Sequence, residues 1–316
     1  MTPFGTTKSG EEVKKITLSA HGLHVTILTY GAIVQDVRLD GVDHSLTIGS
    51  DMISDYESAM QYFGCVVAPV ANRLSEASAV IAGERHTLEA NLEGQHTLHG
   101  GSRGAQSHVW KVVDSGMDFV VLSHVMPNLR SGFPGNRTIV AHFSLSEGPT
   151  LQLLLTTTTD APSIANATNH SYWNLNEGSG IRGHVLKIAA DHYLPTDHQG
   201  LVTGEIRTVS GTSYDFRSFV PLTPTDPPLD HTFCVALQRG QVLPRLWVEG
   251  TSGVSMTVST SEPGIHIYDA RDSAYCGIAI EAQSWPDAPN KPAFPGIEVT
   301  PDKPVVQVTE WRFKAP

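Results

Sequence analysis

The chain has 316 residues, with 21 Lys and Arg against 32 Asp and Glu, which gives a formal net charge of −11. An acidic chain without basic runs is a poor match for nucleic acid or for an anionic membrane surface, so we expect neither as a partner. Charged residues make up only 17%, and 28 Gly and 20 Pro are present, a composition typical of an all-β protein rich in turns.

The cysteines and the first residues point to a cytoplasmic protein. Cys65, Cys234 and Cys276 are far apart and form no Cys-x-x-Cys pair, which predicts reduced thiols rather than a disulfide framework. Residues 1–15 lack the apolar region of a signal peptide, and no apolar run reaches the length of a membrane span. The oligomeric state, monomer or homodimer, stays open.

Short runs rich in β-branched residues, bounded by Gly, Pro, Asn or Asp, recur along the chain and predict β-strands. The first, residues 23–41, is interpreted as two strands joined at Gly31. The later runs, in chain order, are 119–126, 137–145, 151–159, 184–190, 254–261, 264–270, 277–283 and 304–313.

We expect these strands to form one antiparallel β-sandwich that spans residues 1–316 as a single domain. The Pro-rich stretch 220–230 is flanked by strand-like sequence of unchanged composition, so it is interpreted as a long loop and not as a linker. No helical pattern exceeds about three turns.

Side chains alternate between the two faces of a strand, which makes two segments notable. In 277–283, Glu281 is expected on the open face of a strand whose other face is apolar. If residues 168–173 are also extended, His170 and Tyr172 share one face. Polar side chains on two such strands can converge over one concave surface, which predicts a binding or catalytic site there.

Each candidate residue has a structural and a functional interpretation. His170 and His99 are either histidines with a satisfied hydrogen bond or participants in catalysis; His99 precedes two glycines that allow close approach to a ligand. Together with His231 and Glu281 they contain enough donors for a metal site, but their spacing matches no short-range ligand pattern, so no metal is predicted.

The remaining candidates are charged or amide side chains. A carboxylate within an apolar strand needs a partner, and for Glu281 an ion pair with Arg73 is one explanation. Asp230, at the end of the Pro-rich stretch, is either a turn residue or a ligand for a polar substrate. Asn72 and Arg73 form either a strand-end salt bridge or part of a binding site.

Motifs for other chemistries are missing from the sequence. It contains no Gly-x-Ser-x-Gly nucleophile elbow, no Gly-x-Gly-x-x-Gly fingerprint and no phosphate-binding loop. We therefore expect no organic cofactor.

With these residues identified, the chain resembles the aldose 1-epimerase (galactose mutarotase) family over nearly its whole length. Eight motifs occur in the family's order, and their combination carries the resemblance. They are "ANR" (71–73), "LHGG" (98–101), "FPGN" (133–136), "TNHSYWNL" (168–175), "TGEI" (203–206), "DFR" (215–217), "LDHTF" (229–233) and "EAQSWPDAPN" (281–290).

The resemblance implies a fold, a reaction and residue roles. The fold is a large antiparallel β-sandwich, the galactose mutarotase-like supersandwich, with the sugar in an open cleft. The reaction interconverts the α and β anomers of a free hexose such as galactose or glucose by acid–base ring opening and closure, without a metal or cofactor. Glu281 is implied as general base and His170 as general acid, with His99 assisting. The implied substrate-binding residues are Asn72, Arg73, Tyr172, Asp230 and His266, of which Asp230, Asn72 and Arg73 would bind sugar hydroxyls.

Two departures from the family pattern bear on specificity. Ala68-Pro69 stands where the family commonly has Gly-Arg, and His266 stands where it usually carries a Gln that touches the sugar. Glu281 and His170, the residues implied in proton transfer, are both retained, so catalysis is expected, while the preferred sugar is left open.

Three other functions are kept as alternatives. A hexose 6-phosphate enzyme needs clustered cations, for which only Arg73, with Arg103 and Arg217, is available. A hydrolase needs two carboxylates across the scissile bond, and Glu281 with Asp230 is the only pair to nominate. A non-catalytic sugar-binding module has no need for the His170–Glu281 pair.

Overall fold

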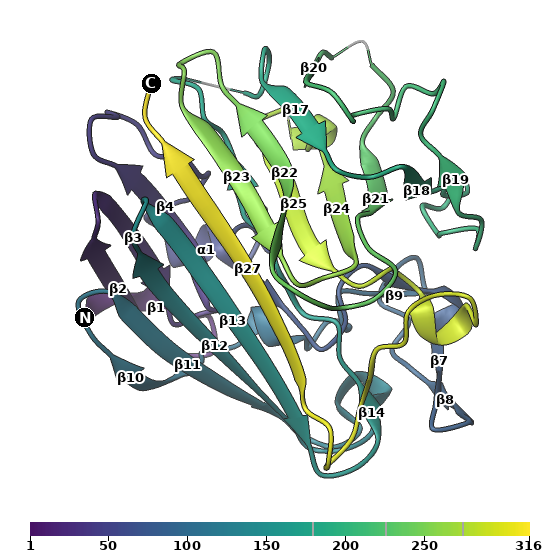
Figure 1. The fold of residues 1–316 in the computed structure, drawn as a ribbon. Helices are drawn as coiled ribbons and strands as arrows, with labels where there is room; N and C mark the ends of the chain where they lie inside the picture. The colour runs from purple at the N-terminus through teal and green to yellow at the C-terminus, as the bar shows by residue number, and fades with distance from the viewer. Residues whose placement is uncertain (179, 225, 274) are drawn as a thin grey trace.

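The computed structural model describes residues 1–178, 180–224, 226–273 and 275–316, and within them the chain is almost entirely β-structure. The largest sheet has nine strands, all paired antiparallel, and crosses the whole molecule (Figure 1). Its strands, in spatial order, are β10 (Lys111–Ser115), β11 (Phe119–Met126), β12 (Arg137–Ser146), β13 (Thr150–Thr159), β27 (Val305–Lys314), β23 (Ser255–Thr260), β22 (Leu243–Glu249), β17 (Val185–Ile188) and β20 (Val220–Pro221).

Two further antiparallel sheets pack against the large one. The first contains β1 (Thr2–Thr6), β2 (Glu12–Ala20), β3 (Leu23–Leu28) and β4 (Ile33–Leu39) in sequential order. The second has the order β16 (Tyr172–Trp173), β25 (Ile278–Gln283), β24 (Gly264–Tyr268), β21 (Asp230–Cys234), β18 (His192–Leu194) and β19 (Arg207–Thr208). They lie towards opposite ends of the large sheet in Figure 1.

The remaining elements are short. Four two-stranded pairs are present in the described residues: β5 (Val66–Val67) with β15 (Thr168–Asn169), β6 (Arg73–Leu74) with β9 (Thr97–Leu98), β7 (Ser78–Ile81) with β8 (Glu84–Thr87), and β14 (Ser163–Ile164) with β26 (Glu298–Val299). The helices are α1 (Ile53–Tyr56) and the single 3₁₀ turns Ser75–Ala77, Ala105–Ser107, Arg130–Gly132, Arg271–Ser273 and Ala288–Asn290. Over the described ranges, no helix is long and apolar enough to cross a membrane.

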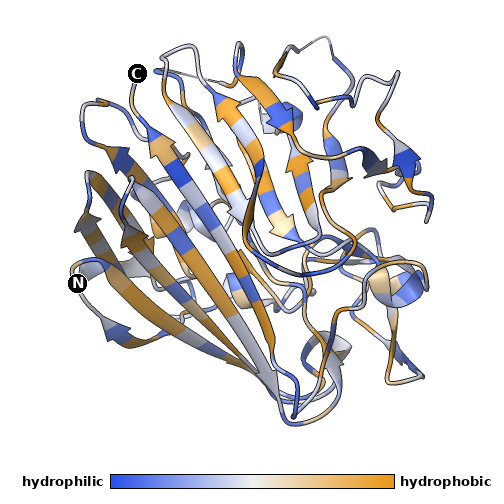
Figure 2. Cartoon of the chain, in the orientation of Figure 1, coloured by the Kyte–Doolittle hydropathy of each residue, from blue (hydrophilic) through white to orange (hydrophobic). Residues whose placement is uncertain are grey.

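One hydrophobic core joins the three large sheets. Along β12, buried and half-buried residues alternate, as period two requires for a strand with one face inward. Figure 2 shows this alternation on the strands of the large sheet. Leu18 of the four-stranded sheet, Phe143 of the nine-stranded sheet and Ile280 of the six-stranded sheet are fully buried in the same cluster. Burial of each such side chain contributes about 1.5–3 kcal/mol.

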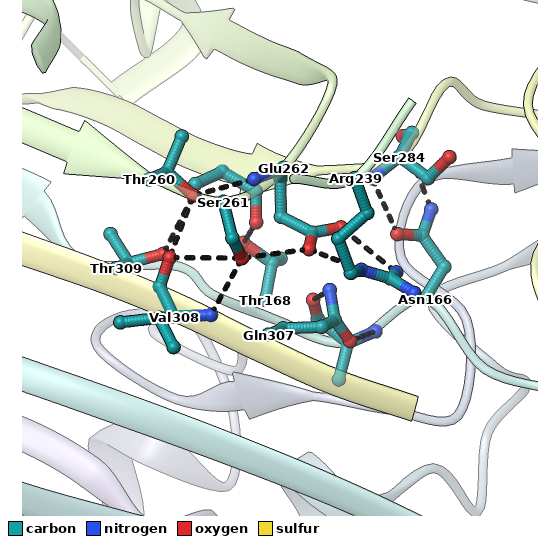
Figure 3. A network of polar contacts seen from close by, with 12 residues as sticks. Asn166, Thr168, Arg239, Thr260, Ser261, Glu262, Ser284, Gln307, Val308 and Thr309 are labelled. Carbon is teal, nitrogen blue, oxygen red and sulfur yellow. Dashed lines mark hydrogen bonds and ion pairs between the residues drawn. The ribbon is translucent and has the colours of Figure 1, made fainter. Parts of the chain in front are cut away.

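Side-chain amides, rather than strand pairing alone, hold the segment that leads to His170. Gln307 on β27 donates from Nε2 to the carbonyl of Ala167 at 2.8 Å, and its Oε1 accepts the N–H of the same residue at 2.9 Å. Asn166 makes the equivalent double contact with the backbone of Ser284, at 2.7 and 3.2 Å. These amides imitate the ladder of a neighbouring strand, and Figure 3 shows both in the polar network behind the six-stranded sheet.

The same network contains a fully buried carboxylate. Arg239 donates to both oxygens of Glu262, at 2.6 and 3.0 Å, in the two-pronged geometry that makes such pairs strong (Figure 3). Ser261 Oγ donates to the same carboxylate at 3.3 Å. The negative charge of Glu262, just after the end of β23, is therefore compensated by Arg239.

The long strand predictions are confirmed. The run 119–126 is β11 with the same bounds, and 137–145 and 151–159 agree with β12 and β13 within one residue. Gly31 lies between β3 and β4, as expected. The later runs coincide with β17, β23, β24, β25 and β27.

Two segment predictions need correction. Residues 168–173 do not form one strand, because the chain changes partners at His170: β15 pairs with β5, whereas β16 pairs with β25. The stretch 220–230 is not wholly a loop, since it begins with β20 and ends with the first residue of β21. Residue 225 within it lies outside the described residues.

Acidification from pH 7 to 5.5 is expected to destabilise the protein, in part through His184. This fully buried ring accepts the Leu175 N–H at Nε2 (2.8 Å) and lies 2.9 Å from the Ile181 carbonyl at Nδ1, which fixes the neutral form. Burial lowers the pKa of His184 to about 4, against the opposing effect of the Ile181 carbonyl. The unfolded chain therefore takes up a proton below about pH 6.5 while the folded chain does not, which costs about 1 kcal/mol over this interval.

The measurement is urea unfolding at both pH values for wild type and His184→Gln. The variant is expected to be less stable at pH 7 but to lose about 1 kcal/mol less on acidification. Equal losses in the two proteins would contradict the assignment.

Candidate active site

A cavity of about 470 Å³ lies over the face of the six-stranded sheet that is turned away from the main core. Its walls come from four parts of the chain that are distant in sequence. They are residues 58–63, residues 72–99, the segment around His170, and the strands β21, β24 and β25 with the turn that follows β24.

Strand alternation explains why polar side chains collect on this face. On β24 and β25, Ile265, Ile267, Ile278 and Ile280 belong to the main core. The residues between them point the other way, and His266 lies directly opposite Glu281 in the antiparallel register. On β21, Thr232 lies opposite His266 from the other side. The sheet therefore presents a cross-strand row of polar groups to the cavity.

All eight residues nominated from the sequence line this cavity. They are Asn72, Arg73, His99, His170, Tyr172, Asp230, His266 and Glu281. Their individual roles stay predictions.

Glu281 and His170 lie together at the base of the cavity. His170 Nε2 is 3.5 Å from Glu281 Oε1, and the two side chains are only 5% and 2% exposed. Glu281 Oε2 and His170 Nδ1 have no hydrogen-bond partner among the described residues. A carboxylate with one unused oxygen, next to a ring that can carry a proton, is equipped to exchange protons with a bound molecule.

The environment of Glu281 differs from two sequence expectations. The suggested ion pair with Arg73 is absent from the described residues, because Arg73 pairs with Asp230 instead. The face of β25 that carries Glu281 is also not open to solvent, since all six residues of the strand are buried. The carboxylate lies at the bottom of a cavity and not on an exposed sheet.

His99 is held in one tautomer by the backbone. The N–H of Asn72 donates to His99 Nδ1 at 3.2 Å, and the N–H of His99 donates back to the Asn72 carbonyl at 3.0 Å. Burial, reinforced by the charges of His170 and Arg73, lowers the pKa of His99 well below its ordinary value. The ring is therefore neutral with its proton on Nε2, which makes it a hydrogen-bond donor.

The segment around His170 is fixed by contacts on its main chain. The N–H of His170 donates to the Cys65 carbonyl at 2.8 Å, and its own carbonyl accepts the Gly64 N–H at 3.0 Å. Asn169 donates from Nδ2 to Gly64 O at 2.8 Å, and its Oδ1 accepts the Ser171 N–H. This asparagine thus supports the turn that aims His170 into the cavity.

A linked set of charged groups, Arg73, Asp230 and His266, forms another part of the cavity lining. Arg73 donates to Asp230 Oδ2 at 3.2 Å, and His266 Nε2 lies 2.8 Å from Asp230 Oδ1. Burial alone would raise the pKa of Asp230, but the hydrogen bond from His266 and the charges of His266 and Arg73 lower it well below its ordinary value. Asp230 is thus an ionised acceptor, in a strand and not in a turn.

The described residues contain no group of three or more His, Cys, Asp or Glu side chains arranged to hold a metal ion. His231, one of the histidines considered for a metal site, lies outside the cavity, because its neighbour Asp230 faces the cavity and strand alternation turns His231 to the other side. Its ring packs against Tyr214 at 4.4 Å.

Comparisons with known proteins identify the family of the chain. A family model described as aldose 1-epimerase matches residues 14–312. Galactose mutarotase of Rattus norvegicus is 31% identical, with 99% of this chain and 97% of the relative covered, and aldose 1-epimerase of Haemophilus influenzae is 30% identical, with 96% and 97% covered. The chain belongs to the aldose 1-epimerase family. Among solved structures, an aldose epimerase homologue from C. elegans superposes with a TM-score of 0.89 at 27% identity, covering 96% of this chain and 99% of that one.

A second solved structure supports the same architecture. Galactose 1-epimerase from Lactobacillus acidophilus has a TM-score of 0.86 at 26% identity, with 98% of this chain and 97% of that chain covered. The galactose mutarotase-like β-sandwich expected from the sequence is therefore the fold of this member of the aldose 1-epimerase family.

One wall of the cavity of this aldose 1-epimerase family member was not predicted from the sequence. Tyr62 covers both cavity histidines, with its ring centroid 4.7 Å from that of His99 and 6.0 Å from that of His170. Burial raises the pKa of Tyr62 to about 12, so the phenol stays protonated. Phe63 also lines the cavity and stacks on Tyr172, with 3.9 Å between the ring centroids. Two adjacent aromatic residues shortly before Asn72 were the available signal.

Proposed function

We propose that this protein is an aldose 1-epimerase that interconverts the α and β anomers of a free hexose such as galactose or glucose. The observation that carries the proposal is the 3.5 Å separation of His170 Nε2 and Glu281 Oε1 inside a buried cavity. The two oxygens that exchange protons in mutarotation, the anomeric hydroxyl and the ring oxygen, are bonded to the same carbon. A base and an acid that serve both atoms must therefore lie close together.

The proposed cycle returns every proton to its starting place. Glu281 accepts the proton of the anomeric hydroxyl while His170 donates its own proton to the ring oxygen, and the C1–O5 bond breaks to give the open-chain aldehyde. Rotation about C1–C2 presents the other face of the carbonyl. The reverse transfers then close the ring as the other anomer and regenerate both residues. Each positioned group contributes about 10²–10⁴-fold.

The other cavity residues have supporting roles in this proposal. His99, neutral with its proton on Nε2, donates a hydrogen bond near the ring oxygen. Asp230 accepts from sugar hydroxyls, and Asn72 and Arg73 donate to them. Tyr172 lies 5.2 Å from His170, centroid to centroid, and contributes an apolar wall for the sugar ring.

The charge arrangement favours this reaction over the two enzymatic alternatives. Both oxygens of Asp230 are already bound by protein groups, which makes it a poor partner for Glu281 in hydrolysis. Arg73 is the one Arg or Lys among the described residues that line the cavity, whereas Arg103 and Arg217 lie outside it. A phosphorylated sugar therefore lacks the clustered cations that it needs.

We also propose that residues 1–316 form a single domain, because one core cluster contains residues from Ile16 to Phe313. The three cysteines are free, which fits a cytoplasmic location.

Polarimetry of freshly dissolved α-glucose and α-galactose tests the function. The protein is expected to speed the approach to the equilibrium rotation of at least one of them in proportion to its concentration. Equal rates with and without protein, on both sugars, would refute the proposed function.

A further inference from the structure

Both ring nitrogens of His266 are already occupied by protein groups. Nδ1 lies 2.9 Å from Thr232 Oγ1, and Nε2 lies 2.8 Å from Asp230 Oδ1. The residue is only 4% exposed and Thr232 only 1%. An imidazole has two positions for hydrogen bonds, so this ring has none left for a substrate hydroxyl.

The direction of these bonds follows from the partners. Because Asp230 is ionised, it can only accept, and Nε2 of His266 must carry a proton and donate. Asn72 Nδ2 lies 3.3 Å from the same Nε2, which has no lone pair to offer it. Asn72 Oδ1 accepts the Arg73 N–H at 2.8 Å. The amide hydrogens of Asn72 therefore stay available to a ligand in the cavity.

The strand register places His266 in contact with two residues of β21, Thr232 and Asp230. His266 lies directly opposite Thr232, and Asp230 is two residues earlier on the same face of that strand. Thr232 thus fixes the rotation of the ring, and the ring fixes Oδ1 of Asp230. Arg73 fixes Oδ2 from the other side. Each oxygen of Asp230 retains a second lone pair, and the side chain is 35% exposed.

We propose that His266 is a positioning residue, which touches no sugar atom and acts by holding Asp230 as a rigid acceptor of sugar hydroxyls. This inference rests on the proposed function and refines it, since it removes His266 from the groups that contact the substrate. Hydroxyl recognition at this wall then comes from Asp230 as acceptor, with Arg73 and Asn72 as donors. The residue at position 266 therefore affects the affinity for the sugar only by fixing the orientation of the Asp230 carboxylate.

A double-mutant cycle of His266→Ala and Asp230→Ala tests the inference. Each single change is expected to weaken substrate binding by about 10- to 100-fold, the effect of losing a hydrogen bond to a charged group, with little change in kcat. In the Asp230→Ala background, His266→Ala is expected to have no further effect on KM. Additive effects would show that His266 touches the sugar by itself and would overturn the proposal.

Two variants and a second readout strengthen the experiment. Thr232→Val, which frees the His266 ring, is expected to raise KM as His266→Ala does, whereas Thr157→Val, at an equally buried position of β13, is expected to leave it unchanged. An unchanged KM in Thr232→Val would contradict the proposal that His266, held by Thr232, positions Asp230. If Asp230→Ala does not fold, Asp230→Asn completes the cycle.

Calorimetric binding of a 1,5-anhydrohexitol, which lacks the anomeric hydroxyl, repeats the cycle without turnover. If His266→Ala and Asp230→Ala lower the affinity for this ligand non-additively, the positioning role of His266 is supported. Additive losses of affinity refute it. If the wild type does not accelerate mutarotation, the proposed function is refuted. The role of His266 is still tested in that case, because the binding measurements alone show whether the effects of His266→Ala and Asp230→Ala are coupled.

Discussion

Replacing Glu281 by Gln is expected to lower kcat for mutarotation by about 10²–10⁴-fold. The amide has nearly the shape of the carboxylate but cannot accept a proton from the anomeric hydroxyl. Within the part of the chain that the structure describes, Glu281 pairs only with His170, at 3.5 Å, and its Oε2 has no hydrogen-bond partner, so the substitution breaks no strong contact there. The measurement is polarimetry on α-galactose and α-glucose over a range of sugar concentrations.

Glu310→Gln is the matched control for this experiment. Glu310 lies on β27, outside the cavity, where its Oε1 accepts a hydrogen bond from Gln152. Its substitution is expected to leave kcat unchanged. A Glu281→Gln protein that keeps more than about a tenth of the wild-type kcat would rule out this residue as general base.

His170→Asn is expected to reduce kcat by about 10²–10⁴-fold while KM changes much less. Asn preserves a polar group of moderate size but cannot transfer a proton to the ring oxygen. The backbone contacts of residue 170 with Cys65 and Gly64 do not depend on the side chain, so the turn is expected to survive. Full kinetic curves from polarimetry separate the two parameters.

His231→Asn provides the comparison for His170. This substitution removes a half-buried histidine next to the site, from the face of β21 that points away from the cavity. Its kcat and KM are expected to stay near those of the wild type. If His170→Asn raises KM and leaves kcat intact, His170 is a binding residue and the acid must be sought elsewhere, with His99 as the next candidate.

The sequence predicted the long strands well because their pattern is local. In β12 and β13, inward and outward residues alternate over ten positions, so period two is visible without knowledge of the partner strand. The two-residue strands β15 and β16 carry no such signal. Each depends on a partner that is distant in sequence: β15 pairs with β5, which comes earlier in the chain, and β16 pairs with β25, which comes later.

The candidate site shows the same division. Motif order and alternation were enough to bring eight residues to one cavity, yet they did not provide the hydrogen-bond partners. The pairing of Arg73 with Asp230, and not with Glu281, depends on the register of β21 against β24. The hydrogen bond at Nδ1 of His266 likewise depends on the register, because it requires Thr232 to lie directly opposite. Register is set by contacts across strands, which a single sequence does not display.

The position of β27 in the large sheet has a consequence for synthesis. This strand pairs with β13 on one side and β23 on the other, so it alone connects the two halves of the sheet in the described residues. A growing polypeptide that has not yet released residues 305–314 from the ribosome carries two long strands with unpaired backbone edges. Such edges recruit other chains. We therefore expect nascent protein to depend on chaperones until β27 emerges, and the Gln307 support behind His170 to form at the same moment.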